Sequence, residues 1–243
     1  QGRVVWAMSE IVSDPHFQKT EIRKKAEALL NSAVSKIENL KHLRAIAFSL
    51  WGLSLFEGKR FKQKAEFLAG KLKQAFLAGR DLENGWDWFE AKLTYANGIL
   101  PAALLKYSRL IGDKKGREIG LKSLDFLCRI TFWGDVFVPI GQKGWYEKGK
   151  KRALFDQQPE EAYHMMLALL EALKLTEDLK YKRLLSKCFS WFVGNNLLGE
   201  SLYDSKTAGC YDGLSRHGVN KNQGSESLLS YLMARLIIEE NSL

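Results

Sequence analysis

Cysteine is scarce in this sequence, and long apolar stretches are missing from it. The three cysteines, Cys128, Cys188 and Cys210, are odd in number and widely spaced. This argues against a disulfide framework and fits a reducing compartment. No apolar run approaches the roughly 18 residues that a membrane-spanning helix needs, because charged residues interrupt each one. We therefore expect a cytoplasmic protein without a membrane span.

The start of the chain lacks both an initiator methionine and a signal-peptide pattern. It opens Gln1-Gly2-Arg3, and a helical pattern begins almost at once with no cap before it. Such a start is typical of a cut end. We expect residues 1–243 to be a single domain from the C-terminal part of a longer protein.

The net charge of +9 raises the question of nucleic acid. The lysines, however, are spread along many amphipathic segments, and the densest basic run, Lys143 to Arg152, also contains Glu147. No zinc-finger, recognition-helix or RNA-binding signature accompanies them. We interpret the excess charge as solvated helix faces and expect no nucleic-acid partner.

Nine helical segments of two alternating kinds can be recognised from their periodicity. Four carry one apolar stripe and a charged back, as a helix with one face in water does: 20–40, 61–78, 115–132 and 179–193. Five are apolar on nearly every side, which predicts helices enclosed by others: 3–12, 43–56, 98–111, 161–173 and 226–238. The alternation predicts an all-α fold, an (α/α) toroid of helical hairpins with inner and outer helix rings.

The number of helices falls short of a closed ring. Six hairpins hold twelve helices, three more than the nine segments of this chain. We therefore expect an incomplete (α/α)6 barrel that lacks its first helices.

The lengths of the links indicate which end of the ring carries the functional site. Links after the enclosed helices are short (57–60, 112–114 and 176–178), whereas links after the amphipathic helices are long (80–94, 133–158 and 194–224). In an up-down ring, links of one type lie at one end. Because loops held by a rigid scaffold commonly carry function, we expect the site at the end with the long loops.

The first long loop concentrates tryptophans and carboxylates just before an enclosed helix. Tryptophan faces stack on sugar rings, while acids bind hydroxyl groups or transfer protons. The alternative is that the Trp-x-Trp-Phe motif simply plugs the mouth of the ring. The candidate residues here are Trp86, Asp87, Trp88, Glu90, Tyr95 and Asn97.

The second long loop leads into a helix predicted to begin at or near Pro159. Asp156 is a good N-cap, and Glu160 in the first turn complements the helix dipole. Neither role explains two adjacent glutamines beside a buried helix, and for His164 we favour a satisfied core or rim histidine over a ligand contact. The candidates here are Trp145, Asp156, Gln157, Gln158 and His164.

The third long loop is rich in glycine and asparagine, which permit tight turns. Glu226 follows it, in the first turn of a mainly apolar helix, where an ionised carboxylate is costly unless it is paired. We expect Arg44 or a ligand as its partner, and a dipole-matching or salt-bridged role is the alternative. The candidates here are Asp212, Asn222, Gln223 and Glu226.

Three motifs, one in each long loop, resemble those of the six-hairpin glycosidase-like (α/α) toroids. The type that they resemble most is found with bacterial glycosyltransferases and in oligosaccharide-utilisation gene clusters. The motifs are Trp86-Asp87-Trp88-Phe89-Glu90, Phe155-Asp156-Gln157-Gln158-Pro159, and Asn220-x-Asn222-Gln223-Gly224-x-Glu226-Ser227. The resemblance implies a carbohydrate context, with an oligosaccharide or glycoconjugate as the partner.

Two functional hypotheses follow. A glycoside hydrolase needs one carboxylic acid and a second carboxylate, and the candidates are Asp87, Glu90, Asp156 and Glu226, with acid and base unassigned. The alternative is a non-catalytic module that binds glycan or scaffolds a glycosyltransferase. We expect no cofactor and no metal, since Cys210 and His217 lack the neighbouring ligands that a zinc site requires.

Overall fold

The computed structural model describes residues 1–241, which contain nine α-helices and eight short strands. Five helices correspond to the segments predicted to be enclosed: α1 (Gly2–Ser13), α3 (Leu43–Leu53), α5 (Ile99–Ile111), α7 (Pro159–Thr176) and α9 (Ser225–Glu240). Four correspond to the amphipathic segments: α2 (Glu21–Val34), α4 (Lys59–Gly79), α6 (Lys114–Thr131) and α8 (Leu179–Ser190). The prediction of a mainly helical protein with nine helices is confirmed.

Three predicted helices end three or more residues earlier than expected, one of them α3, which ends at Leu53 and not at residue 56. α2 ends at Val34 and is followed by a separate 3-10 turn, Ile37–Asn39, while α8 ends at Ser190 before the 3-10 turn Trp191–Val193. A further 3-10 turn, Pro15–Phe17, follows α1. Helix ends commonly tighten in this way, and periodicity does not distinguish the two forms.

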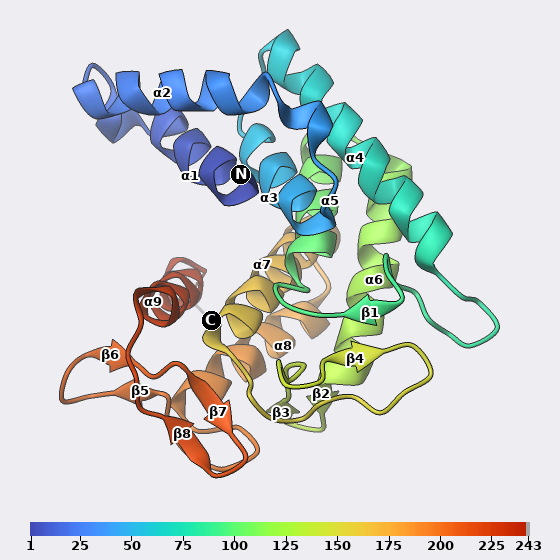
Figure 1. The fold of residues 1–243 in the computed structure, drawn as a ribbon, viewed down its shortest axis with the longest axis vertical. Helices are drawn as coiled ribbons and strands as arrows, with labels where there is room; N and C mark the ends of the chain where they lie inside the picture. The colour runs from blue at the N-terminus through green and yellow to red at the C-terminus, as the bar shows by residue number, and fades with distance from the viewer. Residues whose placement is uncertain (242–243) are drawn as a thin grey trace.

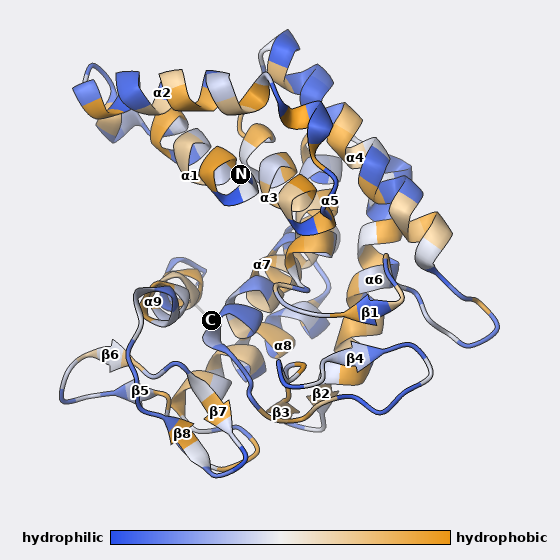
Figure 2. Cartoon of the chain, viewed as in Figure 1, coloured by the Kyte–Doolittle hydropathy of each residue, from blue (hydrophilic) through white to orange (hydrophobic). Residues whose placement is uncertain are grey.

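The helices are arranged in two layers along an arc. α1, α3, α5, α7 and α9 pack on one another in this order, and α2, α4, α6 and α8 each pack on the enclosed helix that precedes them. Figure 1 shows the arc and the outer helices on its convex side. Hydrophilic and hydrophobic residues alternate along α2 and α4, as expected for helices with one face in water (Figure 2). The described residues therefore form an arc of hairpins.

The two helices at the ends of this arc are less enclosed than the sequence predicted. α5 and α7 are buried almost all round, whereas α9 leaves four large apolar side chains exposed: Leu229, Leu232, Met233 and Leu236. α1 likewise exposes Val4. The physical reason is position, because each end helix has an enclosed neighbour on one side only.

The long links contain short strands, which the sequence analysis did not predict. Four two-stranded antiparallel sheets form there (Figure 1): β1 (Lys92–Leu93) with β4 (Tyr146–Glu147), β2 (Phe132–Trp133) with β3 (Val136–Phe137), β5 (Tyr203–Asp204) with β6 (Gly209–Cys210), and β7 (Gly213–Ser215) with β8 (Gly218–Asn220). Backbone groups in packed loops need hydrogen-bond partners, and short ladders supply them. Strands of two or three residues are too short to show alternation in the sequence.

The core is one continuous hydrophobic cluster that runs from Val5 on α1 to Ile237 on α9. Its largest fully buried side chains include Trp88, Trp191 and Phe76, the first two of which come from links rather than from the nine helices. None of the helices within residues 1–241 has the length and apolar character needed to cross a bilayer.

Candidate functional site

Charged residues recur at the same position of the enclosed helices. The second residue is Arg3 in α1, Arg44 in α3, Glu160 in α7 and Glu226 in α9. The contacts among them show that these first turns meet at the end that carries the long links. We call these four residues the first-turn cluster.

Arg3 joins three helices through the first-turn cluster. Its Nη1 lies 2.7 Å from Glu226 Oε1, and its Nη2 pairs with Glu160 Oε1. The side chain of Glu160 is 10% exposed and that of Glu226 is 59% exposed. Burial raises the pKa of Glu160, Arg3 opposes this rise, and the charge of Glu226 adds to it. The sequence analysis expected Arg44 or a ligand as the partner of Glu226; in the structure the ion-pair partner is Arg3, and Arg44 pairs with Glu90 instead.

Arg44 organises the first long loop instead. This buried guanidinium pairs with Glu90, its Nε donates to the Tyr95 carbonyl oxygen at 2.7 Å, and its Nη2 donates to Asn97 Oδ1 at 3.2 Å. The guanidinium also lies over the Tyr95 ring, 5.3 Å from its centroid. Tyr95 remains 44% exposed, so it presents a ring face to solvent beside the first-turn cluster.

A second buried carboxyl lies behind this cluster. Asn97 Nδ2 donates to Glu161 Oε2 at 2.9 Å, while Glu161 Oε1 has no hydrogen-bond partner among the described residues. Burial, followed by the neighbouring charge of Glu160, raises the pKa of Glu161 to about 7. Glu161 therefore ties the start of α7 to the start of α5.

A groove of about 420 Å³ opens between α1, α7 and α9. Its polar lining includes Arg3, Glu160, His164 and Glu226. Trp6 and Tyr163 form its aromatic wall. The Trp6 ring stacks on Tyr163 with centroids 6.3 Å apart. A cavity with a charged rim and an aromatic wall suits a ligand that has both hydroxyl groups and an apolar face.

His164 contributes an unpaired imidazole to the groove. It is buried, and its Nδ1 lies 3.8 Å from Glu160 Oε1 without a hydrogen-bond partner among the described residues. Burial, and then the charge of Arg3, lowers the pKa of His164 to about 3. The imidazole is thus neutral at pH 7 beside a carboxyl of raised pKa, so it can form hydrogen bonds with a ligand without carrying a charge. The expectation of a satisfied core or rim histidine does not describe it.

The tryptophans of the first long loop lie in the core. Trp88 is fully buried, and Trp86 is 4% exposed with its Nε1 donating to the Glu90 carbonyl oxygen at 2.8 Å. Their packing corresponds to the plug alternative and leaves no ring face for a ligand. Asp87 does not line the groove, and its Oδ1 is buried without a partner among the described residues. Trp145 is half-buried under the Lys92 ammonium group, 4.5 Å from the ring centroid.

The glutamines of the second long loop have structural positions. Gln157 is fully buried, where its Oε1 accepts from Trp191 Nε1 at 2.7 Å and its Nε2 donates to the Leu154 carbonyl oxygen at 2.6 Å. Gln158, and not Asp156, is the N-cap of α7. The helix does begin at Pro159, as predicted. Asp156 instead has a left-handed backbone, with φ of 58°, and lines a separate pocket.

The candidate site residues of the third long loop form hydrogen bonds that hold the start of α9 in place. Asp212 Oδ1 accepts from the Gly224 backbone and from Ser227 Oγ, each at 2.7 Å, and Asp212 Oδ2 accepts from Asn222. Gln223 Nε2 donates to Asp204 Oδ2 at 3.1 Å. These bonds position Glu226 at the groove without placing the loop residues inside it.

Of the predicted residues, the structure gathers Glu90, Tyr95 and Asn97 around Arg44, and it places His164 and Glu226 in the groove. Sequence reasoning missed Trp6, Arg3 and Glu161 and gave Glu160 only a dipole-matching role. Aligning the first turns of the enclosed helices would have found Arg3 and Glu160, because charge recurs at their second position. Within residues 1–241, no group of three or more His, Cys, Asp or Glu side chains could hold a metal ion.

Comparisons with known proteins find similarity in structure alone. No known protein family matches the chain by sequence, and no curated protein matches it. The fold is similar to that of a sugar epimerase from a ruminal bacterium, with a TM-score of 0.66 and 11% sequence identity. The alignment covers 97% of this chain and 69% of the epimerase. At this identity the likeness establishes a shared fold.

Proposed function

We propose that this protein acts on carbohydrate, binding a sugar ring in the groove between α1, α7 and α9. The observation that carries the proposal is that Glu160, a buried carboxyl of raised pKa, and the neutral imidazole of His164 line the same groove as the Trp6 ring. The indole supplies a stacking face and the carboxyls supply acceptors for hydroxyl groups. A volume of about 420 Å³ is in the usual range for small-molecule sites.

The fold supports a carbohydrate context. The similar structure is that of an enzyme that acts on a sugar, and the motifs of the long loops resemble those of glycosidase-like toroids. We further propose that the arc of helices is part of an (α/α) toroid, so that the groove lies near the axis of the ring. This position would gather the first turns of the enclosed helices around one ligand.

If the reaction is hydrolysis, the chain offers two carboxyls from facing helices. Glu160 is the better acid because its raised pKa favours the protonated form that a leaving oxygen needs. Glu226 is the second carboxylate, and its greater exposure gives water access to it. Trp6, which lines the groove, would contact the sugar.

A non-catalytic module is the second candidate, and the position of Arg3 favours it. One guanidinium holds both Glu160 and Glu226 in ion pairs, which stabilises the two ionised carboxylates and opposes proton transfer. In that function the same residues would only bind glycan, and the protein could serve as a scaffold for a glycosyltransferase.

The test is a panel of manno-, gluco- and galacto-oligosaccharides. Binding is measured by calorimetry, and both cleavage and epimerisation of the sugar are followed by chromatography. We expect Glu160→Gln to lower turnover at least about a hundredfold, the usual contribution of a general acid or base, while binding persists. Glu118→Gln, an exposed change on α6, is the matched control.

Each outcome decides between the candidates. Turnover that Glu160→Gln removes supports an enzyme, whereas wild-type binding without turnover supports the module. Absence of binding across the panel would refute the carbohydrate proposal itself.

A further inference from the structure

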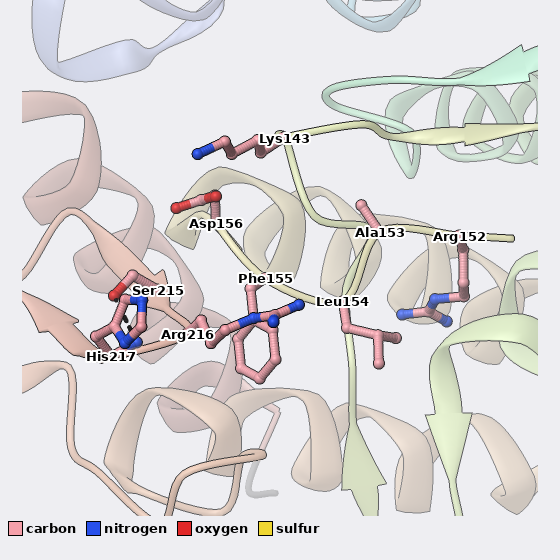
Figure 3. A pocket seen from close by; sticks show the side chains of 9 residues that line it. All are labelled: Lys143, Arg152, Ala153, Leu154, Phe155, Asp156, Ser215, Arg216 and His217. Carbon is pink, nitrogen blue, oxygen red and sulfur yellow. Dashed lines mark hydrogen bonds between the residues drawn. The ribbon is translucent and has the colours of Figure 1, made fainter.

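A second cavity, which shares no lining residue with the groove, lies between the second and third long links. Its volume is about 570 Å³. Figure 3 shows Lys143, Arg152 and Arg216 around it, together with Asp156 and the Phe155 ring. We call this cavity the basic pocket. Its lining thus includes three side chains that are positively charged at pH 7 and one carboxylate.

Arg152 is a fixed cation at this pocket. Its guanidinium donates to three backbone carbonyl oxygens, those of Ile130, Val138 and Pro139. Burial lowers the pKa of Arg152 to about 10, so the group stays protonated at pH 7. Because carbonyl oxygens are neutral, these bonds hold the guanidinium in place without cancelling its charge. Its Nε also lacks a hydrogen-bond partner among the described residues.

The other basic side chains of the pocket are also uncompensated. Within residues 1–241, Lys143 and Arg216 form no ion pair, whereas Lys148 and Lys150 of the same link pair with Asp81 and Glu147. Both unpaired side chains are exposed. The Arg216 guanidinium lies over the Phe155 ring, 5.8 Å from its centroid, which positions it beside the cavity. The pocket therefore holds positive charge that no ion pair among the described residues compensates.

Such a pocket favours an anion that also has hydroxyl groups. Guanidinium and ammonium groups form strong charge-assisted hydrogen bonds with phosphate and sulfate oxygens. Asp156 would repel a bare anion but can accept hydrogen bonds from hydroxyl groups, and Phe155 offers an apolar wall. We propose that the basic pocket binds a sugar that carries a phosphate or sulfate ester. The argument uses none of the groove residues, so it does not depend on the function proposed for the groove.

The test is calorimetric titration at low and at physiological ionic strength. The probes are glucose 6-phosphate, glucose and inorganic phosphate. We expect saturable binding of glucose 6-phosphate that is tighter than that of inorganic phosphate, and weaker binding at higher salt. Lys143→Gln and Arg216→Gln should each weaken it about tenfold or more, the usual effect of losing a hydrogen bond from a charged group.

Lys221→Gln is the matched control, since Lys221 is exposed on the same third link but does not line the pocket. We expect less than about a twofold change for it, as is usual for a single exposed charge, and unaltered phosphate binding in Glu160→Gln. Equal losses in Lys221→Gln and Arg216→Gln would show diffuse charge and overturn the proposal. Lack of saturable glucose 6-phosphate binding would overturn it as well, and tighter binding of inorganic phosphate would overturn the sugar part.

Discussion

Glu160 and Glu161 are adjacent in the sequence, yet they have different environments at the start of α7. Neighbouring residues of a helix point about 100° apart, so Glu160 faces the groove and Arg3 while Glu161 faces α5 and Asn97. Glu160 can therefore contact a ligand. Glu161 holds α7 in the position that presents Glu160 to the groove, and its buried carboxyl makes the stability of the protein depend on pH.

At this residue scale, we predict that Glu161 destabilises the fold as the pH rises. Its pKa is raised from an ordinary 4.5 to about 7, so between these values the folded state keeps a proton that the unfolded state has lost. The contribution of Glu161 to the free energy of unfolding therefore falls as the pH increases through this window and levels off above it. The loss is up to about 3 kcal/mol, since each pKa unit corresponds to roughly 1.4 kcal/mol.

Urea unfolding between pH 4.5 and 8 measures this effect. Glu161→Gln keeps an oxygen that can accept from Asn97 but cannot ionise, so its stability should decline less than that of the wild type by this amount. Glu118→Gln, an exposed substitution, should leave the pH dependence unchanged. Identical pH profiles for Glu161→Gln and the wild type would contradict the prediction.

At the scale of helices, close backbone approach determines how the enclosed layer packs. A Cβ added to Gly98, at the start of α5, would lie 2.3 Å from the carbonyl oxygen of His164 on α7. One added to Gly2 on α1 would lie 2.4 Å from the carbonyl oxygen of Ala45 on α3. Glycine at these positions lets neighbouring helices approach closely enough for their first turns to share one site.

We therefore predict that Gly98→Ala destabilises the protein by about 1–3 kcal/mol, the usual cost of overpacking a core. Gly70→Ala is the matched control, because no atom lies within 4 Å of the added Cβ in the middle of α4. There alanine should stabilise the helix by about 0.5–1 kcal/mol. Chemical denaturation measures both changes, and destabilisation of equal size in the two variants would refute the packing explanation.

At the scale of the whole molecule, Arg3 connects the first and last helices. It bonds to Glu226, 223 positions away in the sequence, and to Glu160 on the helix between them. α9 leaves one apolar face exposed, so the ion pair restrains a helix that packing holds on one side. The position of Glu226 at the groove therefore depends on Arg3.

We predict that Arg3→Met increases amide hydrogen exchange in the first turns of α9. Methionine cannot bond to Glu226 and leaves Glu160 without its cation, which also raises the pKa of that carboxyl further. Arg117→Met, an exposed change on α6 without an ion pair among the described residues, is the control. Unchanged exchange of residues 225–229 in Arg3→Met would show that packing alone positions α9.

The sequence by itself determined the helices and the end of the molecule that carries the site. Apolar periodicity gave the ends of each helix to within three residues, except that α2 ends six residues earlier than predicted, and Pro159 marked the start of α7 correctly. Link lengths indicated where polar residues gather. These features depend on local spacing, since the positions of the apolar residues along a helix show which of its faces is buried.

Only the tertiary structure decided which of those residues share a site. Trp88 and Gln157 looked like ligand contacts but are fully buried, while Glu161 gave no signal, and both Arg3 and Glu161 bond to side chains far away in the sequence. A sequence pattern shows that a polar residue lies beside the apolar face of a helix. It does not show which side chain from another part of the chain packs against that residue. The partner lies more than 60 positions away in each case, so packing alone brings the two together.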